Sequence, residues 1–156
     1  MRNVVAGVLA AFTIGAVVSP ARSAAQSAAR TTRDGVYSAA QADRGHLVFE
    51  RVCARCHGSD LRGDEIMEVP ALVDERFAAS WSGEPLFALF RKIGETMPAN
   101  APGSLSPRER ADTVAYLLRA NHVPAGVDDL GTDPGVLNRI RIEPGSAVTP
   151  SAVSSP

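Results

Sequence analysis

Apolar residues recur at helical spacing in three segments of the chain. The first segment begins after Ser38, and Gln41 follows three positions later, a pattern typical of a capping box. The spacing predicts a helix that starts at Ser38 and runs into Cys53. Its core-facing positions are Ala42, Gly45, Phe49 and Val52.

The other two segments are bounded by glycine, proline and serine. The second has Pro85 in its first turn, and we expect Gly94 to end it. The third has Ser106 at its N-cap, Pro107 at the first helical position and Glu109 completing a capping box. The apolar faces consist of Leu86, Phe87, Leu89, Phe90 and Ile93 in the second segment and Ala111, Val114, Ala115, Leu117 and Leu118 in the third.

No segment alternates between apolar and polar residues as a strand would, so we predict an all-α fold with three main helices. The folded domain is expected to span residues 37–126. Residues 26–36 are small and polar and are interpreted as a linker. Residues 127–156, rich in Pro, Gly, Ser and Ala, are predicted to be a mostly disordered tail. The alternative is that this tail covers a groove through its apolar residues, which are Val136, Leu137, Ile140 and Ile142.

The N-terminus has the pattern of an export signal. Arg2 precedes an uncharged apolar run over Val4–Val18, and small residues follow it. This predicts a signal peptide over residues 1–25 and a periplasmic or secreted protein. The run is shorter than the roughly 20 residues of a membrane-spanning helix, so removal is favoured. Association with a membrane is expected only if the peptide is retained as an anchor.

Composition narrows the range of partners. The formal net charge is −1, which excludes a broad basic surface for nucleic acid. Lys92 is the only lysine, so a partner-docking face cannot be a ring of lysines. Only 5% of the residues are aromatic, which indicates a thin core unless a bound macrocycle fills it.

The segment CARCH, from Cys53 to His57, has the spacing of a c-type haem attachment site. Two thiols on one helical turn reach the two vinyl groups of a haem, and the adjacent histidine points at the iron. We therefore predict one covalently attached haem c. A thioredoxin-like pair would need a βαβ context, and a zinc site needs about four suitably spaced ligands. A disulfide between Cys53 and Cys56 would leave His57 without a role.

The second axial ligand has four candidates: Met67, Met97, His46 and His122. Pro98 biases Met97 toward an extended backbone, and a loop there can present the thioether to the iron. A methionine is more often core filler than a ligand, so we expect Met67 to be packing. Both histidines are expected at the surface.

Residues 37–126 resemble the class I c-type cytochromes. The stretch RGHLVFERVCARCHG is similar to the first helix and haem-binding turn of that family. The stretch TMPANAPGSLSPRERADTVAYLL resembles its methionine-ligand loop and last helix. The resemblance implies a small cytochrome c fold around one haem, with His57 and Met97 as the axial ligands of the iron. Gly45 and Tyr116 match the positions at which the first and last helices cross.

The same resemblance implies roles for two further residues. In VPAL, the Pro70 carbonyl would accept a hydrogen bond from the other nitrogen of His57, and Trp81 would lie near a haem propionate. The haem pocket is expected to consist of Leu61, Leu72, Phe77, Phe87, Phe90 and Ile93.

More narrowly, the stretches GSDLRGDE and WSGEPLFALF resemble bacterial monohaem cytochromes that accompany quinoprotein (PQQ) dehydrogenases. This implies an electron carrier rather than an enzyme, which takes single electrons from a dehydrogenase and delivers them to an oxidase or another acceptor. One alternative is a fixed haem subunit of a PQQ-type dehydrogenase or oxidase complex. Others are a haem sensor or catalyst with a weak sixth ligand, and a haem-free thiol oxidoreductase.

Overall fold

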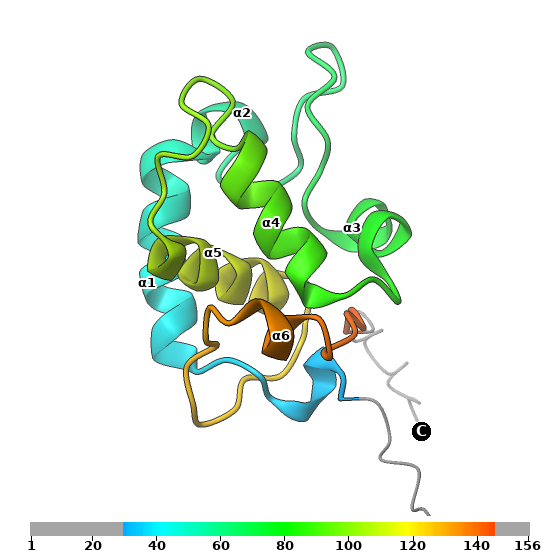
Figure 1. Ribbon diagram of the computed structural model, residues 1–156. Coiled ribbons are helices and arrows are strands. Elements are labelled where there is room, and N and C mark those ends of the chain that lie inside the picture. Colours follow the sequence, from blue (N-terminus) through cyan, green and yellow to red (C-terminus); the bar gives the residue numbers. More distant parts are fainter. Residues whose placement is uncertain (1–29, 146–156) are drawn as a thin grey trace, which may run out of the picture.

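A computed structural model describes residues 30–145, and this part of the chain is helical (Figure 1). Pairing between extended segments within it is limited to isolated bridges, so the all-α prediction is confirmed. None of the helices in this range is both long and apolar enough to cross a membrane. The predicted signal peptide lies outside the described residues. The elements are η1 (Thr32–Asp34), α1 (Ala39–Val52), α2 (Ala54–His57), α3 (Asp74–Trp81), α4 (Leu86–Thr96), α5 (Pro107–Ala120) and α6 (Pro134–Leu137).

Helices α1 and α5 cross at the centre of the fold, and both begin as the sequence predicts. The Ser38 hydroxyl accepts a hydrogen bond from the Gln41 backbone N–H, and Ser106 and Glu109 form a complete capping box. The Gln41 side chain, however, does not complete a box at α1. It bonds instead to both backbone groups of Leu130, accepting from N–H and donating to C=O.

Helix α4 is longer than predicted, because Gly94 does not end it. The helix continues to Thr96, and Gly94 is buried inside its last turns. A Cβ at this position would lie 2.5 Å from a guanidinium nitrogen of Arg110. Gly94 therefore marks a close contact between α4 and α5 rather than a helix terminus.

Helix α3 was not predicted from the sequence. Its N-cap side chain makes no capping hydrogen bond, and Asp74, its first residue, has a φ of +60°. Phe77 is its one buried residue, so the segment has no apolar stripe by which its helical period could be detected.

The prediction of a disordered tail is wrong for residues 127–145, which pack onto the helices. The buried apolar side chains of this segment are Leu130, Leu137, Ile140 and Ile142. Its backbone is held by hydrogen bonds from Arg141 N–H to the Arg30 carbonyl and from Ile142 N–H to the Glu84 carbonyl. The groove-covering alternative is therefore correct for this part, and residues 146–156 lie outside the described range.

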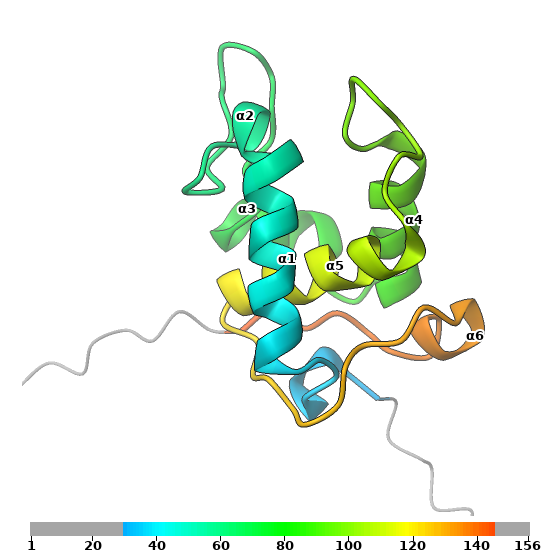
Figure 2. The same ribbon diagram turned by 90° about the vertical axis from the view of Figure 1, so that its left-hand side faces the viewer.

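The predicted linker is also folded where the structure describes it. Thr32 is buried, and its hydroxyl accepts a hydrogen bond from Glu143 N–H while Thr32 N–H donates to the Arg141 carbonyl. Figures 1 and 2 show η1 and the C-terminal segment side by side at the end of the molecule away from α2. The folded unit therefore includes both terminal segments of the described range, because their backbones are hydrogen-bonded to each other.

Candidate functional site

The two cysteines lie on a single helical turn that follows α1 directly. Cys53 N–H donates to the Phe49 carbonyl at 2.7 Å, and His57 N–H donates to the Cys53 carbonyl at 3.0 Å. Both thiols are free, with Cys53 half-buried and Cys56 exposed. Burial raises the pKa of Cys53 to about 11, although the positive charge of Arg51 opposes the shift. Cys53 is therefore a neutral thiol at physiological pH.

His57 closes this turn and is buried, with 7% of its surface exposed. Its Nδ1 lies 3.0 Å from the carbonyl oxygen of Pro70. A carbonyl oxygen only accepts hydrogen bonds, so Nδ1 is the donor in this contact, and in the neutral imidazole the lone pair is then on Nε2. The backbone is fixed as well, because Gly63 N–H donates to the His57 carbonyl at 2.8 Å. The arrangement provides an oriented imidazole of the kind that coordinates metals.

Met97 caps the C-terminal end of α4. Its N–H donates to the Ile93 carbonyl, its backbone is extended as the following Pro98 favours, and its side chain is half-buried. Figure 1 shows the loop after α4 at the same end of the molecule as α2, and Figure 2 shows that the two stand apart across that end. The sequence-predicted residues therefore come from opposite sides of one end of the fold.

The other ligand candidates lie at the surface. Met67 is 61% exposed, so the expectation that it packs in the core is wrong. His46 stacks on Tyr116 with ring centroids 4.9 Å apart, and its Nε2 lies 3.5 Å from a Glu50 carboxylate oxygen. His122 is exposed after the end of α5.

The remaining predicted residues belong to the hydrophobic core or pack against it. Leu61, Phe77, Phe90 and Ile93 are buried in the hydrophobic core, and Leu72 and Phe87 are partly buried against it. Trp81 ends α3 and also packs partly against this core. Its indole N–H makes no hydrogen bond to any residue from 30 to 145.

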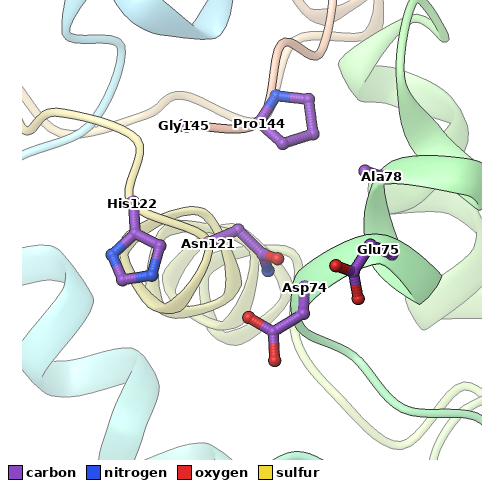
Figure 3. Close-up of a pocket in the computed structure, with 7 residues that line it drawn as sticks. All are labelled: Asp74, Glu75, Ala78, Asn121, His122, Pro144 and Gly145. Atoms are coloured by element: carbon purple, nitrogen blue, oxygen red, sulfur yellow. The ribbon is translucent and has the colours of Figure 1, made fainter. Parts of the chain in front are cut away.

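A surface hollow of about 300 Å³ lies elsewhere, between α3, the end of α5 and the C-terminal segment. Figure 3 shows its side chains around Asn121, whose amide donates to the Leu72 carbonyl. Its lining does not include Cys53, Cys56, His57 or Met97. Sequence reasoning missed this hollow because its residues 144–145 were expected to be disordered. The lining residues are Asp74, Glu75, Ala78, Asn121, His122, Pro144 and Gly145.

The helical core of the chain matches a known family. Residues 40–117, half of the 156-residue chain, match the family model described as "Cytochrome C oxidase, cbb3-type, subunit III". The chain belongs to this family of c-type cytochromes. It is a monohaem cytochrome with haem c as its cofactor. The donor set fits that group, because two free thiols and a histidine with an available Nε2 share one turn.

One solved structure is similar to this cytochrome. It is entitled "Crystal Structure of the Sulfane Dehydrogenase SoxCD from Paracoccus pantotrophus", and the match has 18% sequence identity and a TM-score of 0.46. The alignment covers 73% of this chain and 60% of that one. No curated protein matches the cytochrome significantly. The narrower resemblance to cytochromes of quinoprotein dehydrogenases stays a prediction.

Proposed function

We propose that this electron-transfer haem protein works outside the cytoplasm, in the periplasm or as a secreted protein, and holds its iron between His57 and Met97. Cys53 and Cys56 are the thioether attachment points. The observation that carries the proposal is the contact between His57 Nδ1 and the Pro70 carbonyl. This contact leaves Nε2 as the only imidazole nitrogen free to bind a metal.

The residues of the chain would bind and orient the haem and would not themselves react. When bound, haem supplies one-electron ferric–ferrous chemistry. Pro70 keeps the Nδ1 proton of His57 in place and fixes the plane of the ring. Met97 would supply a thioether as the second protein ligand of the iron, which would leave no open position for a substrate and would raise the reduction potential relative to a second histidine. Trp81, whose indole N–H bonds to no other residue in the described part of the chain, would donate to a haem propionate.

The partners follow from this chemistry. We propose a diffusible carrier that takes single electrons from a dehydrogenase and passes them to an oxidase or another acceptor. The second candidate is a fixed haem subunit, and the oxidase subunit in the name of the matched family favours it. Purification from native membranes separates the two, because a fixed subunit stays with a larger oxidoreductase through size-exclusion chromatography.

Haem attachment tests the proposed site directly. In a host that matures c-type cytochromes, wild-type protein is expected to gain the mass of one haem that survives denaturation. The double variant Cys53→Ala/Cys56→Ala should lose this covalent mass, whereas His46→Ala should keep it because His46 lies at the surface. A wild-type protein that stays colourless in that host would overturn the proposal and leave thiol chemistry at the two cysteines.

A further inference from the structure

A short hairpin, Asp64–Val69, projects between α2 and α3. Asp64 and Val69 are paired by two backbone hydrogen bonds of 2.9 and 2.8 Å. The Asp64 carboxylate also accepts from the N–H groups of Ile66 and Met67, at 2.9 and 3.0 Å. Figures 1 and 2 both show this loop extending beyond the helices near α2. The hydrogen bonds give the tip one defined conformation.

In that conformation two large apolar side chains are exposed to solvent. Ile66 is 96% exposed and Met67 is 61% exposed, at adjacent positions. Exposed apolar side chains that lie together are typical of surfaces that bind another protein. Methionine suits such a surface, because its flexible thioether adapts to the shape it meets.

Acidic groups surround this apolar tip. Glu65 and Glu68 flank it and are exposed, and neither side chain makes an ion pair within the described residues. The basic residue nearest in sequence is Arg62, which pairs with Asp74. A negative rim repels anionic lipid headgroups and attracts a protein surface that carries Lys or Arg.

The base of the hairpin is joined to the haem-binding turn. Gly63 N–H donates to the His57 carbonyl, and the Pro70 carbonyl contacts His57 Nδ1. The two residues that bracket the hairpin therefore both touch the histidine. A protein that binds the tip is therefore positioned beside the proposed electron-transfer site.

We propose that the Asp64–Val69 hairpin is a docking finger. It packs Ile66 and Met67 against an apolar patch on a redox partner protein, and the rim of that patch carries Lys or Arg side chains that face Glu65 and Glu68. The docking finger rests on the proposed electron-transfer function, which supplies the need for such a partner.

Electron exchange with a defined probe protein tests the docking finger. The probe is a mitochondrial-type cytochrome c, whose apolar haem edge is ringed by lysines, and ferricyanide serves as a small oxidant that needs no docking. The tip variant is Ile66→Ser/Met67→Gln, and the rim variant is Glu65→Gln/Glu68→Gln. The matched controls are Leu47→Ser, an exposed apolar residue on α1, and Glu84→Gln/Asp128→Asn, which removes two exposed acidic groups elsewhere.

At low ionic strength, the tip and rim variants should each exchange electrons with the probe at least about threefold more slowly than wild type. Their rates with ferricyanide, and both rates of the control variants, should stay within about 30% of wild type.

Several results would overturn the docking finger. If the tip variant exchanges electrons with the probe as fast as wild type, Ile66 and Met67 do not contact the partner. If the rim variant and its charge control lose the same share of that rate, the effect comes from net charge alone. Loss of binding to phosphatidylcholine vesicles in the tip variant, with an unchanged probe rate, would make the hairpin a membrane contact. A wild-type protein that exchanges no electrons with ferricyanide instead overturns the proposed function, and the docking finger with it.

Discussion

Gly45 in α1 lies directly against the backbone of Asp112 in α5. A Cβ on residue 45 would stand 1.8 Å from the Asp112 carbonyl oxygen, a distance that no packed structure tolerates. The two helices also pack together one turn further on, where the Phe49 and Tyr116 ring centroids are 5.2 Å apart. Because α1 leads straight into Cys53, this crossing fixes the position of the turn that carries both cysteines and His57.

Gly45→Ala is therefore expected to destabilise the protein, although alanine is intrinsically the better helix former by about 1 kcal/mol. Overpacking of this kind costs about 1–3 kcal/mol, because the helices must move apart. Urea unfolding followed by far-UV circular dichroism measures the loss. Gly131→Ala is the matched control, since a Cβ there meets nothing within 4 Å. Equal stabilities of the two variants would show that the crossing is not tight.

The C-terminal segment is expected to contribute to stability through Leu137. Leu137 is fully buried in α6, so Leu137→Ala should lower the free energy of unfolding by about 2–5 kcal/mol. Val136→Ala, at a neighbouring position that is 39% exposed, should change it by less than about 1 kcal/mol. Thermal unfolding of the holoprotein compares the two. If Leu137→Ala costs no more than Val136→Ala, the segment does not pack as described.

The capping box of α5 is expected to make the free energy of unfolding depend on pH. Hydrogen bonds from Ser106, together with Arg51, lower the pKa of Glu109 below its ordinary value of 4.5. A lowered folded-state pKa stabilises the protein above pH 4.5 and loses this contribution as the pH falls through the folded-state value. Glu109→Gln keeps a side chain that can complete the capping box but removes the charge, so it should be less stable than wild type at pH 7 by about 0.3–1 kcal/mol, the usual effect of an exposed carboxylate at a helix N-terminus.

This difference between Glu109→Gln and wild type should shrink as the pH is lowered below 4.5. Urea titrations at pH 7, 4.5 and 3 measure it. Glu95→Gln, an exposed glutamate near the end of α4, should follow wild type at every pH. A gap that stays constant from pH 7 to pH 3 would contradict the role of the Glu109 charge.

Local signals in the sequence were sufficient for the helices that carry the site. Ser38 and Ser106 cap their helices as predicted, and CARCH falls on the turn that follows the first of them. These features depend on contacts within three or four residues, so they can be read without knowledge of the rest of the fold. The same holds for the extended backbone of Met97, which Pro98 imposes.

The features that were missed depend on contacts between distant residues. Leu130 is held by Gln41, 89 positions earlier, and Thr32 bonds to Glu143, 111 positions later. No periodic pattern marks such partners, so composition alone predicted disorder. Met67 was expected in the core because it is apolar, but the pairing of Asp64 with Val69 turns it outward.

The optical spectrum of the matured holoprotein, oxidised and then reduced, tests the central claim most directly. We predict a c-type reduced spectrum and a weak long-wavelength ferric band from sulfur-to-iron charge transfer. The band should vanish in Met97→Ala, with haem still attached, and persist in Met67→Ala, because Met67 stands exposed on the hairpin. A band that survives in Met97→Ala, or is absent from wild type, would contradict ligation by His57 and Met97.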